Sequence, residues 1–187
     1  MLTITNIRRA TLAALVGGIA ASSAAFAVPM VGGAPMYPTK NIVENAVNSK
    51  DHTTLVAAVK AAGLVDTLAS PGPFTVFAPV NNAFTKLPAG TVPTLLKPEN
   101  KAALTKALTY HVVAGKLTAA DLAAKVDAGG GKAMLTTVEG ESLTVMRAGR
   151  NGLSVTDQKG DKARVTIADV LQSNGVIHVV DTVLLPK

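Results

Sequence analysis

The stretch PGPFTVFAPV, residues 71–80, marks the point at which the pattern of the chain changes from helical to extended. Prolines stand on both sides of the apolar run FTVFA, residues 74–78. Aromatic and β-branched side chains bounded by turn-forming residues are typical of a short buried strand. We therefore predict a strand here that lies in the interior of the fold.

The residues before this strand predict short amphipathic helices. Apolar side chains recur at helical spacing in residues 41–49 and again in residues 53–62. We expect Asp51 to cap the second of these helices and Gly63 to end it. The apolar residues 64–69 continue this helical region up to the strand.

Helices also follow the strand. Residues 81–87 predict a helical turn, and a longer helix follows Pro98, a residue favoured in the first turn. A short strand then begins at Val112 and ends at Gly115. Residues 118–125 predict another helix, with Thr118 and Asp121 as its capping box, although Glu or Gln is the usual partner.

Strands and turns dominate the second half of the chain. Asn151-Gly152 is a strong signal for a hairpin turn. The predicted strands are MLTTV (134–138), SLTVMRA (142–148), LSVTD (153–157), ARVTIAD (163–169) and VIHVVDTVLL (176–185). Because the helices come first and the strands later, we predict an α+β domain whose sheet is mainly antiparallel.

The first 27 residues predict a secretory signal peptide. Arg8 and Arg9 precede an apolar run that is too short to span a bilayer comfortably, and Ala25-Phe26-Ala27 provides a cleavage site after Ala27. A retained membrane anchor and a twin-arginine signal are the alternatives, but the flanking residues favour the general secretory route. We expect a periplasmic or secreted protein without a stable membrane anchor.

The remaining residues predict one domain. Residues 28–39, rich in proline and glycine, predict a flexible lead-in, and residues 40–187 predict the domain itself. The net charge is +6 for the whole chain, and loss of two signal-peptide arginines lowers it to +4. The lysines are scattered and aromatic residues are few, which argues against nucleic-acid binding. We expect a monomer with a solvated basic surface.

Most motifs of enzymes and metal sites are missing. The sequence has no cysteine and no serine in a G-x-S-x-G motif. GGGKAM, residues 129–134, departs from a phosphate-binding loop. Asp157 and Asp161 resemble the start of a calcium loop, but Ala168 stands where glutamate would close it. Glu139 and Glu141 predict a solvated turn. We therefore expect no enzyme, no metal and no cofactor.

His111 is one of three histidines, and Tyr110 precedes it in LTYHVVAGK, residues 108–116. In a strand these neighbours point to opposite faces, and in a helix they diverge by about 100°. Neither geometry makes a catalytic pair. We predict that His111 is buried, neutral and hydrogen-bonded to nearby backbone, with a lowered pKa. His178, between valines on its own face, is predicted to be a satisfied sheet residue.

Three motifs in order resemble a fasciclin domain. They are GPFTVFAPVNNAF (72–84), the Tyr110-His111 pair, and NGVIHVVDTVLLP (174–186). The resemblance extends over residues 40–187 and implies a β-wedge of mainly antiparallel strands with helices packed on it. Two positions depart from the family pattern. Val80 replaces a common threonine and is expected to alter a hydrogen bond, and Ala114 replaces a common proline.

The resemblance implies an adhesion or interaction module that binds a protein or polysaccharide at a cell surface or in a matrix. It carries the family's attachment residues onto Tyr110, His111, Asp169 and Val170, although a local cap is the more conservative interpretation of Asp169. It also implies structural roles for eight further residues. These are Phe74, Phe77, Pro79, Asn82, Phe84, Gly175, His178 and Asp181. The alternative function is a carrier of a small apolar ligand such as a carotenoid, although few aromatic residues are present to line its pocket.

Overall fold

The computed structural model describes residues 28–149 and 152–187 of the chain. The predicted signal peptide and its cleavage site lie outside the described residues. Asn151 of the predicted hairpin turn lies outside them as well. No helix in the described ranges is both long and apolar enough to cross a membrane.

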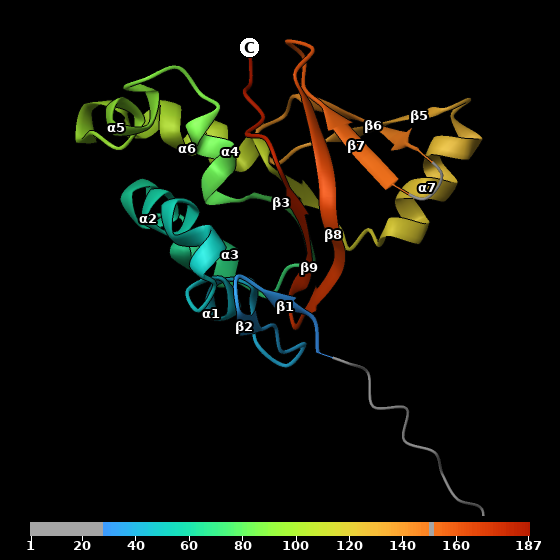
Figure 1. Cartoon of the computed structure of the whole chain (residues 1–187), viewed down its shortest axis with the longest axis horizontal. Coiled ribbons are helices and arrows are strands. Elements are labelled where there is room, and N and C mark those ends of the chain that lie inside the picture. The colour runs from blue at the N-terminus through green and yellow to red at the C-terminus, as the bar shows by residue number, and fades with distance from the viewer. Residues whose placement is uncertain (1–27, 150–151) are drawn as a thin grey trace, which may run out of the picture.

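A seven-stranded sheet forms the centre of the molecule (Figure 1). In spatial order its strands are β4 (Val112–Ala114), β3 (Phe74–Pro79), β9 (Gly175–Val180), β8 (Lys162–Gln172), β7 (Gly152–Thr156), β6 (Ser142–Ala148) and β5 (Lys132–Thr136). The neighbouring strands pair antiparallel except β3 and β9, which are parallel. A bridge between Val113 and Thr137 joins the two ends of the sheet, so that the sheet is nearly closed.

Helices cover this sheet on two sides. They are α1 (Ile42–Ala46), α2 (Thr53–Ala62), α3 (Val65–Ala69), α4 (Asn81–Thr85), α5 (Thr91–Leu95), α6 (Lys101–Tyr110) and α7 (Ala119–Ala128). Figure 1 shows α1 to α6 gathered on one side of β3 and β9, with α7 on the other side against β5 and β6. The α+β class and the mainly antiparallel β-wedge are therefore confirmed.

Strands β3 and β9 divide the interior into two cores. The helix-side core lies under α1 to α3 and α6 and includes Ile42, Leu55, Val59, Leu68, Val76, Ala78, Val112, Val170, Ile177 and Val179. The barrel core lies inside the curved sheet and includes Phe77, Tyr110, Val113, Leu122, Val126, Leu143, Val145, Val155, Val180 and Leu184. Because side chains of a strand alternate between its faces, Val76 and Phe77 enter different cores.

The predicted flexible lead-in is wrong for most of its length. Residues 30–35 form a small hairpin of β1 (Met30–Val31) and β2 (Ala34–Pro35). Val31 and Met36 are only 3% and 2% exposed, and both belong to the helix-side core. The proline-rich and glycine-rich composition of this segment therefore produces a tight hairpin that closes the base of the core.

The helix ends show where local rules hold. Gly63 ends α2 in the left-handed conformation, and Thr118 and Asp121 form the predicted capping box of α7. Asp51 does not cap α2, because it lies in a 3-10 helix, Lys50–His52, that runs into α2. Instead, Asn81 Oδ1 accepts a hydrogen bond of 3.1 Å from the backbone N–H of Thr54.

The strand predictions are accurate in type but not always in length. The hairpin of β6 and β7 is confirmed, with Ala148 opposite Gly152. Strand β8 continues to Gln172, beyond the predicted end at residue 169, because register shifts let it bend along β9. Strand β9 ends at Val180, and residues 181–187 continue without regular structure. Helix α5 was not predicted from the sequence.

Candidate functional site

The Tyr110-His111 pair lies where α6 ends and β4 begins. Tyr110 is the last residue of the helix and His111 follows as its C-cap. Both side chains are buried, with 0% and 3% exposure. The predicted divergence is therefore confirmed: Tyr110 enters the barrel core, whereas His111 lies at the boundary with the helix-side core.

His111 fastens the C-terminal segment to α6. Its Nδ1 donates to the carbonyl oxygen of Ala107 at 2.8 Å, and its Nε2 accepts from the N–H of Leu184 at 3.0 Å. These partners require a single proton on Nδ1, so the ring is neutral. Burial lowers the pKa of His111, and the Ala107 carbonyl and Asp157 oppose that effect only in part. The predicted role as a satisfied core histidine is confirmed.

The Tyr110 hydroxyl group connects the start of β6 to the turn between β7 and β8. The hydroxyl donates to the carbonyl oxygen of Ser142 at 3.1 Å and accepts from the N–H of Gln158 at 3.3 Å. Burial raises the pKa of Tyr110 to about 12. The neutral phenol is therefore a structural hydrogen-bonding group rather than a proton donor for chemistry near neutral pH.

Asp169 and His178 form a polar connection between the sheet and α7. Asp169 Oδ1 accepts from the N–H of Ala119 at 2.7 Å, so it caps a helix 50 residues away in sequence. The His178 Nε2 donates to the carbonyl oxygen of Leu117 at 2.8 Å, and its Nδ1 lies 3.4 Å from the Asp169 N–H. His178 is fully buried and stacks on Phe77, with 5.7 Å between ring centroids. Asp169 does cap a helix, as predicted, but the helix is α7, which is distant in the sequence, and not a neighbouring segment.

Four residues were predicted as partner contacts, and the side chains of three of them are buried in the folded protein. Tyr110 and Val170 have 0% exposure and His111 has 3%. Asp169 is exposed, but its carboxylate is engaged at α7. A contact role for these residues stays a prediction, and their burial indicates that substituting them would act mainly through folding.

The first and last motifs meet where β3 pairs with β9. Phe74 is half-buried against the helix-side core and lies opposite Gly175. A side chain at Gly175 would collide with the carbonyl oxygen of Phe74, so only glycine permits this close approach. Pro79 ends β3 opposite Val180 and is buried. Phe84 packs on the helix-side core from α4.

Two other predicted structural residues differ in role. Asn82 is exposed and its side chain does not contribute to the described core, whereas Asn81 caps α2. Val80 occupies the N-cap of α4 without a side-chain hydrogen bond, as the departure from the family pattern predicts. Asp181 accepts from the N–H of Arg164 at 2.9 Å and lies 3.8 Å from Lys86.

Asn174 was not predicted, although it is a central buried group. Its Oδ1 accepts from the N–H of Ile42 at 3.0 Å. Its Nδ2 donates to the carbonyl oxygens of Leu68 and Ser70, both at 2.8 Å. One side chain from the β8–β9 turn therefore holds the start of α1 and the end of α3. The pair Asn174-Gly175 indicates a turn in the sequence, but the sequence does not show which distant residues the Asn174 side chain contacts.

The acidic residues serve structural contacts rather than a metal site. Asp157 accepts from the backbone N–H groups of Lys159, Asp161 and Leu185. The predicted solvated turn at Glu139 and Glu141 is instead tied to α6, because Lys106 lies 3.6 Å and 2.9 Å from their carboxylates. Within residues 28–149 and 152–187, no group of three or more potential ligands forms a metal site.

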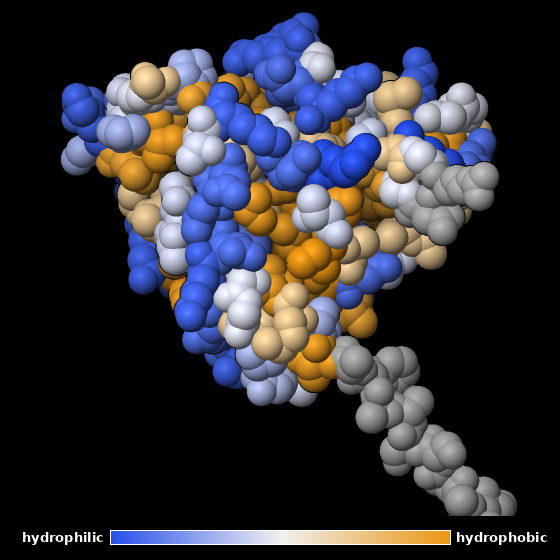
Figure 2. Space-filling view, in the orientation of Figure 1, coloured by the Kyte–Doolittle hydropathy of each residue, from blue (hydrophilic) through white to orange (hydrophobic). Residues whose placement is uncertain are grey.

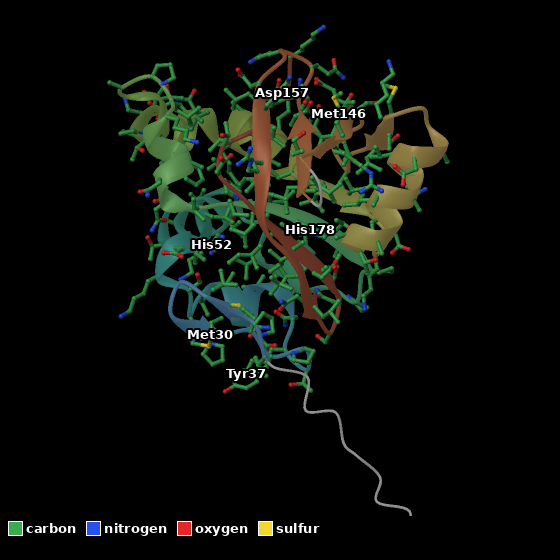
Figure 3. The ribbon with its side chains drawn as sticks, turned by 45° about the vertical axis from the view of Figure 1, so that its right-hand side comes forward. Met30, Tyr37, His52, Met146, Asp157 and His178 are labelled. Carbon is green, nitrogen blue, oxygen red and sulfur yellow. The ribbon has the colours of Figure 1, made fainter. Side chains whose placement is uncertain are left out.

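A cavity of about 50 Å³ lies in the helix-side core, with His52 and His111 among its otherwise mainly aliphatic walls. His52 is 3% exposed, and its Nδ1 lies 2.9 Å from the Ser49 hydroxyl. Burial lowers the pKa of His52, and the Ala78 carbonyl and Asp51 oppose this effect. Figure 3 shows His52 on the helical side of the molecule and His178 at the sheet.

Several large apolar side chains remain on the surface. Met134 is 71% exposed on β5, Leu171 is 39% exposed on β8, and Met30 and Tyr37 are 56% and 43% exposed at the N-terminal hairpin. Figure 2 shows apolar side chains gathered in the middle of one face, over β8, between polar groups. These surfaces, unlike the buried motifs, are accessible to a partner.

Comparison with known proteins agrees with this geometry. The family model described as "Fasciclin domain" matches residues 50–186. Protein sll1483 of Synechocystis is 53% identical over 147 residues, which cover 78% of this chain and 73% of that protein. The immunogenic protein MPB70 of Mycobacterium bovis is 39% identical over 146 residues, covering 75% of this chain and 66% of its own.

A solved structure also shares the fold. It is a fasciclin domain pair from the insect cell adhesion molecule fasciclin I, with a TM-score of 0.70 and 20% sequence identity. The match covers 78% of this chain and 51% of that chain. The pair therefore contains about twice the matched length, and the present chain corresponds to part of it.

Proposed function

Because the chain belongs to the fasciclin domain family, we propose that it is a non-catalytic interaction module that binds a protein or polysaccharide at a cell surface. The family match over residues 50–186 carries this proposal. Homologous fasciclin proteins have adhesion and interaction roles. A family name does not identify a partner, so the surface of this chain must indicate where a partner binds.

The arrangement of Tyr110, His111 and His178 supports a non-catalytic role. A general base must reach a substrate proton within hydrogen-bond distance. His111 and His178 are buried, and backbone groups occupy both nitrogens of each ring. Tyr110 is buried and keeps its proton up to about pH 12. These side chains hold the fold together and leave no reactive atom at the surface.

The proposed contact surface is the exposed strip of β8 between Thr166 and Leu171. Asp169 and Val170 correspond to the attachment pair of animal fasciclin domains, but Val170 is fully buried. Leu171 points to solvent directly beside it, with 39% of its surface exposed. Ala168 and Thr166 are exposed on the same strand. An apolar centre with a polar rim is the usual anatomy of an interaction site.

The proposed location is the periplasm or the surrounding medium. The predicted signal peptide, residues 1–27, supports export. The absence of cysteine in the sequence fits an oxidising compartment, although it does not require one. Release of the mature chain is the expected result of cleavage after Ala27, and the N-terminal sequence of the protein purified from its host tests this expectation.

Site-specific photocrosslinking in the original host tests the proposed surface. A photoreactive phenylalanine analogue replaces Leu171 in one variant and Met134 in the matched control, which is 71% exposed on β5. We expect a discrete adduct of the Leu171 variant with a cell-surface protein or polysaccharide, and none from the control. Adducts from the control alone, or none from either variant, would contradict the β8 surface.

A binding measurement complements the crosslinking. Leu171→Glu should weaken binding to isolated cell-envelope fractions by roughly tenfold, since an apolar contact at the centre of an interface contributes about 1–2 kcal/mol. Met134→Glu introduces the same charge elsewhere and should leave binding within about twofold. Equal losses in both variants would indicate nonspecific charge repulsion rather than a contact at β8.

The alternative function, a carrier of a small apolar ligand such as a carotenoid, is favoured by one observation. The helix-side core contains a cavity of about 50 Å³ with mainly apolar walls. That space is far smaller than a carotenoid, so the described fold would have to open to hold one. The cavity therefore favours a more compact molecule than the sequence-based hypothesis proposed.

A further inference from the structure

The cavity in the helix-side core has more room than a packing defect between side chains. Its volume of about 50 Å³ exceeds several-fold the roughly 10–15 Å³ that one water molecule requires. Its walls come mainly from α1, α2 and α3 on one side and from β3, β8 and β9 on the other. Most of the lining side chains are aliphatic, among them Leu55, Val59, Val76, Val170 and Ile177.

One polar atom in these walls lacks a partner. His52 Nε2 is buried and makes no hydrogen bond within the described ranges of the chain. The Ala78 backbone acts on the ring as a hydrogen-bond partner and raises the pKa of His52, but no hydrogen bond of ordinary distance and angle reaches Nε2. Buried polar atoms are normally paired, and this one belongs to a residue that lines the cavity.

The other histidine of the cavity shows the difference. His111 lines the same space, but its two ring nitrogens bond to Ala107 and Leu184. His52 has a partner at Nδ1, the hydroxyl of Ser49, at 2.9 Å. Ser49 thereby orients the His52 ring and leaves Nε2 as a free hydrogen-bonding position.

We propose that this cavity binds a compact apolar molecule that carries a hydroxyl group, and that this hydroxyl hydrogen-bonds to His52 Nε2. If the Ser49 hydroxyl donates to Nδ1, the ring proton is on Nε2 and Nε2 is a donor; if the hydroxyl accepts from Nδ1, then Nε2 is an acceptor. A ligand hydroxyl complements both cases because it can donate and accept. A short-chain alcohol therefore fits the site.

A charged ligand fits this site poorly. Burial lowers the pKa of His52, so the ring is neutral near pH 7 and does not balance an anion. Lys60 contributes to the walls, but its side chain is exposed to solvent. A buried carboxylate or ammonium group among the aliphatic side chains would lose its hydration without a buried partner. The proposed site is independent of the contact surface on β8.

Ethanol and ethane are suitable probes, because they match a space of about 50 Å³ and differ by the hydroxyl group. The protein, labelled at its methyl groups and its histidine nitrogens, is titrated with each probe and followed by NMR. We expect both probes to shift the methyl resonances of Val76 and Ile177, and ethanol alone to shift His52 Nε2. The control is His178, whose two paired nitrogens should not respond.

Two variants test the assignment. His52→Phe removes the polar atom and retains an aromatic ring, so the affinity ratio of ethanol to ethane should fall by about 3- to 10-fold. Val76→Leu narrows the cavity and should weaken both probes together. Circular dichroism confirms that each variant is folded before the ratios are compared.

Three results would overturn the proposal. These are methyl resonances that neither probe shifts, a His52 Nε2 resonance that ethanol leaves unchanged, and an unaltered affinity ratio in folded His52→Phe. If His52→Phe does not fold, the Nε2 response of the unaltered protein decides the question. If the ligand proposal fails, the proposed interaction function still stands, because the crosslinking experiment tests the separate surface on β8.

Discussion

The barrel core and the helix-side core share a wall but differ in how completely they are filled. In the barrel core, Phe77, Leu143 and Val155 have 0% exposure, and the Tyr110 hydroxyl is hydrogen-bonded. In the helix-side core, a cavity of about 50 Å³ remains and His52 Nε2 lacks a partner. The comparison indicates a rigid scaffold on one side of β3 and β9, and space for a ligand on the other.

The elements around each core explain this difference. Strand pairing almost closes the barrel, so inward side chains from every strand point at one common space and fill it. The opposite side is covered by short helices, and α1 and α3 have five residues each. Such helices present about one turn of side chains to the sheet, which leaves gaps between neighbouring helices.

Acid should destabilise both cores together, and we expect this to be the largest effect. Burial lowers the pKa of His52, His111 and His178 below the usual 6.5. The unfolded chain therefore takes up protons first, and the histidine contribution to stability is fully present above pH 6.5. Below that pH, the free energy of unfolding should fall by at most about 4 kcal/mol per pH unit for the three groups.

Urea unfolding at pH 7.5, 6.5 and 5.5 checks this expectation. The pKa values of Asp121, Asp127 and Glu141 are also lowered, from 3.8, 3.8 and 4.5, so their contributions change at lower pH, outside this window. His111→Gln should make the loss shallower. A free energy of unfolding that is constant between pH 7.5 and 5.5 would contradict the neutral buried histidines.

His111 connects the two cores, and its removal is the next largest effect. His111→Ala deletes the bonds to Ala107 and Leu184 and leaves the Leu184 N–H buried without a partner. We expect a loss of roughly 3 kcal/mol in the free energy of unfolding, measured with urea. Tyr110→Phe removes a hydroxyl but keeps the ring, and should cost about half as much. A His111→Ala variant that keeps its stability but binds cell-envelope fractions more weakly would instead indicate that His111 contacts the partner directly.

Asp169 should contribute a smaller amount from the edge of the barrel. Asp169→Ala loses the cap on Ala119 and places alanine at φ 57°, a left-handed conformation. Together these changes should lower the free energy of unfolding by about 1–2 kcal/mol. Asp169→Asn keeps an acceptor and tolerates the backbone conformation, so thermal unfolding should show a loss of about 0.5 kcal/mol or less. Similar losses in both variants would contradict the capping role.

Local patterns in the sequence predict much of this fold. The apolar run at residues 74–78 predicts β3, and the spacing of Thr118 and Asp121 predicts the capping box of α7. The side chains of Tyr110 and His111 are predicted to point in different directions, because consecutive residues diverge in both a strand and a helix. These features depend on residues that are only a few positions apart, and sequence patterns reveal interactions over that distance.

The features that sequence analysis missed depend on distant partners. Asn81 caps α2 from 27 residues away, and Asn174 reaches Ile42 from 132 residues away. Residues 30–35 form an ordered hairpin although their composition predicts flexibility, because Val31 and Ala34 pack into the helix-side core. The unpaired nitrogen of His52 also depends on how α2 meets the sheet. No local pattern around His52 encodes that position.

The same substitution in both cores tests their difference most directly. Val76→Leu adds a methylene beside the cavity, whereas Val155→Leu adds it to the filled barrel core, and both residues lie on strands. We predict that urea unfolding shows a loss of about 1–3 kcal/mol for Val155→Leu and a change near zero for Val76→Leu. Equal losses would show that the two cores are equally packed and would contradict a built ligand site beside His52.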